Sequence, residues 1–113
     1  MGDIKKLTEK YVAAFNSRDL AKVESLLSKE FELTDPEVQA LTPKADVLNY
    51  IKRLFDAHAS FRFEAHEIIV DRNKSVIHFT LALGKTVLDG VDVITWNSGQ
   101  MTKMYAYLTS RKH

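Results

Sequence analysis

The sequence contains no cysteine, and this absence excludes several kinds of site. Without cysteine there is no disulfide, no thiol nucleophile and no thiolate ligand for a metal ion. The sequence also contains no glycine-rich phosphate loop, Ser-His-Asp signature, internal repeat, linker or low-complexity tract. Any chemistry must therefore come from carboxylates, tyrosines or histidines.

Neither charge sign is in excess, and long apolar runs are missing. Sixteen Lys and Arg residues face fifteen Asp and Glu residues, and no basic stripe alternates with aromatic residues, so nucleic acid is not an expected partner. No run approaches the roughly 20 apolar residues of a membrane span. The first residues also lack the apolar core of a secretion signal. We expect a cytoplasmic protein that binds neither nucleic acid nor a membrane.

The four histidines, His58, His66, His78 and His113, lie far apart in the chain and lack the spacing of metal ligands. We therefore expect no metal and no other cofactor. His78 alternates with apolar neighbours in a predicted strand, so its side chain could line a second surface or serve as an acid/base inside a cavity.

The first half of the chain has the pattern of helices. A length of 113 residues, 45% of them hydrophobic, fits one domain over residues 1–113. Apolar residues at helical spacing predict three helices, at about 3–16, 20–27 and 47–58. Between the second and third, Phe31 and Leu33 alternate with polar neighbours in a short strand that ends at Pro36, because proline has no amide for a sheet ladder.

The second half of the chain has the pattern of strands. Runs rich in β-branched and aromatic residues predict four strands, at about 60–71, 74–84, 86–96 and 101–109. Short turns between them imply consecutive hairpins in an antiparallel sheet. In the strand at 60–71 the apolar residues change from odd to even positions between Ala65 and Ile68. We therefore expect a bulge near His66 and Glu67 and a curved sheet. The result is an α+β fold whose helices close the concave face over an apolar pocket.

Three polar residues stand in positions suited to chemistry. Asp92 lies among apolar residues of one strand face, where lost hydration would keep its carboxyl protonated, although it could point outwards or pair with Lys103. Tyr11 lies on the apolar stripe of the first helix and could donate a hydrogen bond or simply pack. Asp35, at a strand end, could be a general base or a turn residue before Pro36.

These residues belong to segments with a family resemblance. The segment Tyr11–Leu20 (YVAAFNSRDL), with Asp35-Pro36 and the late strand Gly90–Ile94 (GVDVI), resembles the SnoaL-like and nuclear transport factor 2-like superfamily, and within it the ketosteroid isomerases. The resemblance implies a cone-shaped α+β barrel that forms a homodimer through its sheet.

The resemblance also implies roles for the three polar residues. In ketosteroid isomerases a helix-one tyrosine and a protonated aspartic acid hold the dienolate oxygen, while a second aspartate moves a proton between carbons. By their place in the motifs, Tyr11 and Asp92 correspond to the two oxyanion donors, and Asp35 corresponds to the base.

The leading hypothesis is therefore isomerisation of a small hydrophobic carbonyl compound by proton transfer. Its ligand would contact a cavity lined by Phe15, Phe55, Phe63, Phe79, Trp96 and Met104. One alternative is a non-catalytic small-molecule-binding or dimerisation module. Another is a polyketide cyclase, dehydratase or epoxide hydrolase, which would need a further acid/base such as His78 or Arg62 near Asp35 or Asp92.

Overall fold

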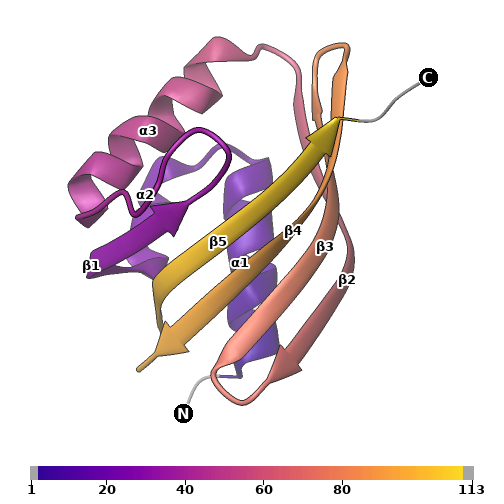
Figure 1. The fold of residues 1–113 in the computed structure, drawn as a ribbon. Coiled ribbons are helices and arrows are strands. Elements are labelled where there is room, and N and C mark those ends of the chain that lie inside the picture. The colour runs from indigo at the N-terminus through magenta and orange to yellow at the C-terminus, as the bar shows by residue number, and fades with distance from the viewer. Residues whose placement is uncertain (1–2, 111–113) are drawn as a thin grey trace.

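The computed structural model describes residues 3–110 and contains three helices and five strands (Figure 1). In chain order they are α1 (Ile4–Asn16), α2 (Leu20–Leu26), β1 (Leu27–Thr34), α3 (Lys44–Ala57), β2 (Phe61–Asp71), β3 (Lys74–Leu83), β4 (Thr86–Asn97) and β5 (Gln100–Ser110). The predicted elements are confirmed in type and order. Among residues 3–110, every helix is too short or too polar to traverse a lipid bilayer.

The sheet differs from the prediction in one strand. Strands β2 to β5 form the expected antiparallel hairpins, but β1 pairs in parallel with β5, so the sheet is mixed with order β1-β5-β4-β3-β2. Parallel partners need a long crossover, and here everything from α3 to β4 supplies it. Because β1 and β2 are the two ends of the order, the sheet curves into a cone without closing.

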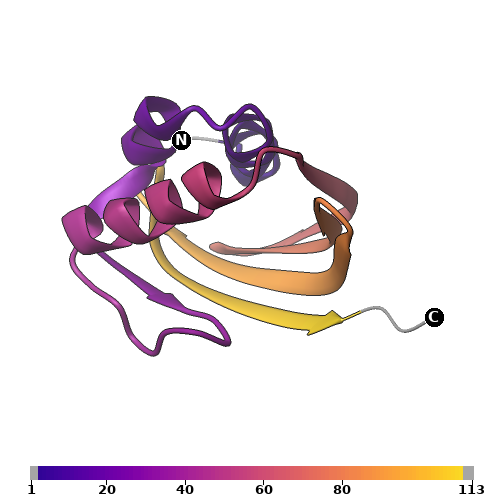
Figure 2. The ribbon, with the colours of Figure 1, turned by 90° about the horizontal axis from the view of Figure 1, so that it is seen from above.

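Two irregularities accompany the curvature of the sheet. The register of β2 against β3 shifts between Ala65 and Glu67, which confirms the predicted bulge. A second shift, between Thr95 and Trp96, interrupts the pairing of β4 with β5. Bulges bend a strand and increase its twist, and Figure 2 shows the sheet curving round the helices, which all lie on its concave side.

The corner between α1 and α2 is tied to the end of α3. Arg18 adopts φ 56°, which ends α1 sharply. Its guanidinium donates to three carbonyl oxygens at the C-terminus of α3, those of Phe55, His58 and Ala59, at 3.3, 2.6 and 3.3 Å. Helix C-termini leave carbonyl groups without partners, so a cation there both satisfies and neutralises them. This contact fixes α1 relative to α3 around the space between them.

A buried polar chain joins α1 to the sheet. The Trp96 Nε1–H donates to Ser75 Oγ at 2.8 Å, and the Ser75 and Thr8 hydroxyls lie 2.9 Å apart. Thr8 Oγ1 also donates to the carbonyl of Ile4 at 2.7 Å. Thr8 and Ser75 are 0% exposed and Trp96 is 2% exposed, so water does not compete for these groups. The chain holds α1 against β3 and β4 one helical turn before Tyr11.

Candidate functional site

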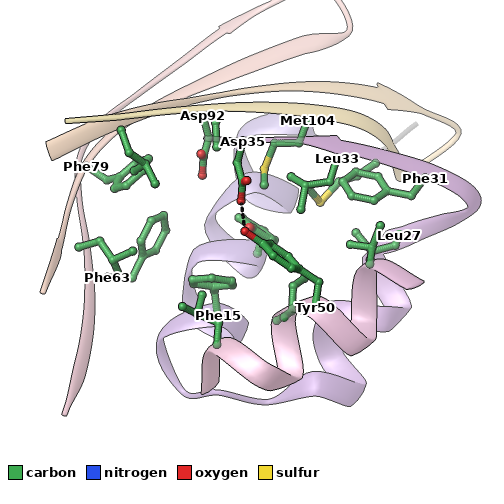
Figure 3. A pocket seen from close by; sticks show the side chains of 18 residues that line it. Phe15, Leu27, Phe31, Leu33, Asp35, Tyr50, Phe63, Phe79, Asp92 and Met104 are labelled. Carbon is green, nitrogen blue, oxygen red and sulfur yellow. Dashed lines mark hydrogen bonds between the residues drawn. The ribbon is translucent and has the colours of Figure 1, made fainter. Parts of the chain in front are cut away.

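One cavity lies between the helices and the concave face of the sheet, and its volume is about 80 Å³ (Figure 3). Its walls are apolar apart from Tyr11, Asp35, Tyr50 and Asp92. The apolar lining residues are Phe15, Leu27, Phe31, Leu33, Val47, Ile51, Leu54, Phe63, Phe79, Leu81, Met101, Met104, Ala106 and Leu108. All three polar residues predicted from the sequence therefore meet at one cavity, although they come from α1, the end of β1 and β4.

Asp92 is an inward-facing residue of β4 and is 3% exposed. Figure 3 shows its carboxyl group pointing into the cavity. Within residues 3–110 no hydrogen bond or ion pair reaches this carboxyl group. Every side-chain polar atom of these residues that is sealed from solvent does have a partner, so the Asp92 oxygens are not sealed and must open onto the cavity. The alternative pairing with Lys103 does not occur, because the ammonium of Lys103 lies 4.0 Å from Glu32 instead.

Burial determines the protonation of Asp92. Loss of hydration, with a smaller contribution from the negative charge of Asp35, raises the pKa of the Asp92 carboxyl to about 8. A carboxyl group in such a site is protonated at neutral pH and can donate a hydrogen bond. The protonated acid is thus a donor with no acceptor among residues 3–110.

Tyr11 presents a second donor to the same cavity. Its side chain is 2% exposed, and its ring lies 5.7 Å from that of Phe15, centroid to centroid. No described residue is hydrogen-bonded to the Tyr11 hydroxyl. Because every side-chain polar atom sealed from solvent in residues 3–110 has a partner, the Tyr11 oxygen must open onto the cavity, as the Asp92 oxygens do. Burial, and then the charge of Asp92, raise the pKa of the Tyr11 hydroxyl, which stays protonated.

Asp35 follows the last residue of β1 and is half-buried. Its Oδ1 accepts hydrogen bonds from the backbone amides of Glu37 and Val38 at 2.8 and 3.0 Å, while its Oδ2 accepts one from the Tyr50 hydroxyl at 2.7 Å. Asp35 is therefore a turn residue before Pro36, and it also lines the cavity.

Tyr50 is the residue of the site that sequence reasoning missed. It lies on α3, three residues after Val47 and four before Leu54, so helical spacing places it beside the apolar stripe. A tyrosine at the border of such a stripe can bury its ring and extend its hydroxyl to a polar partner, and this was the available signal.

Four of the six predicted apolar lining residues, Phe15, Phe63, Phe79 and Met104, contact the cavity. The prediction is wrong for Phe55 and Trp96, which are buried elsewhere in the core. The ring of Phe55 packs against Phe15 and Phe61, with centroid distances of 5.2 and 5.6 Å. Trp96 lies on the same strand face as Asp92, but its indole N–H bonds to Ser75 beneath α1.

The further acid/base candidates lie away from the cavity. His78 is exposed beside His66, with ring centroids 5.4 Å apart. It therefore lies on a second surface, which is one of the two positions predicted for it. The Arg62 side chain is 72% exposed and lies 3.9 Å from Glu64. Within residues 3–110 no group of three or more His, Asp and Glu side chains is arranged to hold a metal ion. His113 lies outside the described residues.

Comparison with known proteins identifies the family. A sequence model of the SnoaL-like domain matches residues 8–104. The chain belongs to the SnoaL-like family. No curated protein sequence matches it significantly.

Solved structures show the same fold at low sequence identity. A proposed ketosteroid isomerase from Kribbella flavida DSM 17836 superimposes with a TM-score of 0.84 and 18% identity over 96% of this chain and 78% of that one. An NTF2-like protein of unknown function from Cytophaga hutchinsonii ATCC 33406 gives 0.83 and 12%, over 96% and 92%. An LEH-like epoxide hydrolase of M. tuberculosis gives 0.76 and 16%, over 92% and 80%. Neighbours of such different activities show the fold alone, so the function must be argued from the cavity.

Proposed function

We propose that this SnoaL-like protein catalyses a ketosteroid isomerase-like proton transfer in a small hydrophobic carbonyl compound. The observation that carries the proposal is a pair of donors that find no acceptor among residues 3–110. The Tyr11 hydroxyl and the protonated Asp92 both open onto the apolar cavity that Asp35 also lines. Buried donors without partners are costly, and a carbonyl oxygen of a ligand is the acceptor they lack.

The reaction follows from the three side chains. With the carbonyl oxygen of a β,γ-unsaturated ketone bonded to Tyr11 and Asp92, the Asp35 carboxylate removes the α-proton. The C–H electron pair moves into the ketone, and the resulting dienolate oxygen carries the negative charge between its two donors. Protonated Asp35 then returns the proton to the γ-carbon, which leaves the α,β-unsaturated ketone and the original carboxylate.

The cavity limits the size of the substrate. Its volume of about 80 Å³ is far below the roughly 300–1,000 Å³ typical of pockets for drug-sized ligands. A skeleton of several fused rings would have to displace lining side chains such as Leu54 and Met101. The proposed substrate is therefore a single-ring or short-chain enone precursor.

The direct test is turnover of cyclohex-3-enone, followed by the ultraviolet absorbance of the conjugated product. We expect measurable isomerisation by the wild type and none above background for Asp35→Asn, whose amide can keep the turn bonds but cannot accept the proton. Tyr11→Phe and Asp92→Ala should each lower kcat by about 10²–10³, the usual loss for one oxyanion donor.

The pH profile separates acid chemistry from simple packing. Wild-type turnover should fall as pH rises through about 8, where Asp92 ionises and ceases to donate. Asp92→Asn keeps a donor that does not titrate, so it should retain much of the activity and lose this basic limb. Ser25→Ala, which removes an exposed hydroxyl on α2 away from the cavity, is the control. Equal turnover by wild type and Asp35→Asn would refute the proposal.

A non-catalytic binding module is the second candidate, and two observations favour it. The cavity is small, and Asp35 Oδ2 is already bonded to Tyr50. A module of this kind would bind phenols or cyclic ketones and raise the melting temperature without any turnover. Tyr11→Phe should weaken such binding, so the thermal shift and the isomerase assay together distinguish the two candidates.

We also propose that the outer face of the sheet pairs two copies of the chain. The helices cover only the concave face (Figure 2), and on the outer face Ile69, Tyr105 and Tyr107 are 52%, 39% and 60% exposed. Exposed apolar patches of this kind mark protein interfaces. Light scattering after gel filtration should give a dimer for the wild type and a monomer for Tyr107→Lys, with Lys10→Glu, an exposed change on α1 in the helical layer, as the control. A monomeric wild type would refute this.

A further inference from the structure

The two oxygens of the Asp35 carboxylate have different tasks. Oδ1 is held by the backbone amides of Glu37 and Val38, at 2.8 and 3.0 Å, in the turn that follows β1. Oδ2 has a single partner among residues 3–110, the hydroxyl of Tyr50 at 2.7 Å. Because the turn occupies Oδ1, Oδ2 is the oxygen that remains to meet a proton from a ligand.

Tyr50 reaches that oxygen from the opposite layer of the fold. Asp35 follows a strand of the sheet, whereas Tyr50 rises from α3, and Figure 3 shows its hydroxyl extending from the helix to the carboxylate. Both residues line the cavity and are half-buried. The bond therefore joins the helical wall of the cavity to the sheet wall at the place where the base must act.

We propose that Tyr50 is a positioning residue for Asp35, which holds Oδ2 in a fixed direction at the cavity. The inference rests on the proposed role of Asp35 as the base. It adds a residue to the three polar residues that the sequence analysis singled out.

The chemistry of Tyr50 suits this task. Burial, and then its bond to Asp35, raise the pKa of the Tyr50 hydroxyl, so it remains a donor at every pH at which the protein would work. Its bond to Asp35 Oδ2 joins a donor to a carboxylate, and such charge-assisted bonds are shorter and stronger than neutral ones. The loss of Tyr50 should therefore leave Oδ2 without a fixed direction.

The structural test does not depend on turnover. Crystal structures of ligand-free wild type and Tyr50→Phe are compared at the Asp35 side chain. We expect Oδ1 to stay on the amides of Glu37 and Val38 in both proteins, and Oδ2 to lose its single direction in Tyr50→Phe, because its hydrogen-bond donor has been removed. Ser25→Ala, which removes an exposed hydroxyl on α2, is the control and should leave Asp35 in place.

The kinetic test uses the isomerase assay. Tyr50→Phe should lower kcat by about tenfold through poorer orientation of Asp35, with little change in KM. Loss of a purely structural tyrosine would lower the melting temperature and leave kcat of the folded protein unchanged. If Tyr50→Phe does not fold, Tyr50→Leu, which keeps an apolar wall and lacks the donor, replaces it.

The outcomes separate this inference from the proposed function. An Asp35 carboxylate that keeps its wild-type direction in a folded Tyr50 variant overturns the inference, whatever the enzyme does. A reoriented carboxylate in a protein without isomerase activity keeps the bond's effect on Asp35 and overturns the role in catalysis together with the proposed function. A reoriented carboxylate with an unchanged kcat overturns the role of Asp35 Oδ2 as the working base.

Discussion

Thr8 and Tyr11 lie one turn apart on the buried face of α1, and their hydroxyls have opposite surroundings. Thr8 is bonded to Ile4 and Ser75, and Ser75 in turn accepts from Trp96. Each hydroxyl has a single proton, so the arrangement that satisfies every group runs from Trp96 through Ser75 and Thr8 to the Ile4 carbonyl. Tyr11 has no such partner among residues 3–110.

This difference distinguishes a hydroxyl that stabilises the fold from one that faces the cavity. A buried polar group destabilises the fold unless it is hydrogen-bonded, so the chain from Trp96 to Ile4 supports the native state as it stands. Tyr11 and Asp92 find no such compensation in the described part of the chain, and their oxygens open onto the cavity instead. Groups that are costly in the empty protein and useful only with an acceptor present are typical of a binding site.

The largest expected effect on stability comes from Asp92→Asn. The pKa of Asp92 is raised from 3.8 to about 8, so between these pH values folding takes up a proton. The free energy of unfolding of the wild type should therefore fall as pH rises through this interval, relative to a variant that does not titrate there. Asp92→Asn should become more stable than wild type by several kcal/mol at pH 9, on the order of 1.4 kcal/mol for each shifted unit.

Urea unfolding followed by circular dichroism at pH 5, 7 and 9 would measure this gap. Asp71→Asn, at an exposed position at the end of β2, is the control and should show no gap that widens with pH. A constant difference between wild type and Asp92→Asn at all three pH values would mean that Asp92 is ionised in the folded protein. Asp92 would then not be a hydrogen-bond donor in the cavity, and only Tyr11 would contrast with Thr8.

Local pattern predicted much of the fold and the position of Asp92. Regular alternation along β4 from Leu88 to Trp96 indicates one inward face, and the bulge in β2 is visible because the inward-facing positions change from odd to even between Ala65 and Ile68. Such signals depend only on which side of a strand a residue occupies.

Contacts between distant segments could not be read in the same way. The alternation of Phe31 and Leu33 indicates a strand but not its partner, so the parallel pairing of β1 with β5 was unexpected. Leu27 also begins β1 instead of ending α2, because the chain passes from helix to strand with no loop between them. Similarly, the bond between Tyr50 and Asp35 depends on how α3 packs beside β1.

Phe55 and Trp96 show a related limit of the sequence pattern. Periodicity placed both residues inside the protein, which is correct, since they are 7% and 2% exposed. It did not say which part of the interior each one fills. The cavity occupies only the space that neighbouring side chains leave, and that space is a property of the complete packing arrangement.

The smallest expected effect on stability comes from substitutions of Thr8 and Tyr11. It is also the most direct test of the contrast between their hydroxyls, because both residues lie on the buried face of α1. Thr8→Val keeps the shape of the side chain but leaves the Ser75 proton without an acceptor, so it should lower stability by about 1–2 kcal/mol. For a domain of this size, that corresponds to a fall in melting temperature of roughly 4–15 °C. Tyr11→Phe removes a hydroxyl that has no partner among residues 3–110, so its melting temperature should stay within a few degrees of wild type or rise.

Turnover should show the reverse order. Thr8→Val, whose side chain does not line the cavity, should retain kcat at temperatures where it is folded, whereas Tyr11→Phe should lose most of it. If Tyr11→Phe were the more destabilised variant, the Tyr11 hydroxyl would have a stabilising partner in the empty protein. Its position at the cavity would then reflect packing of α1 and not readiness for a carbonyl ligand.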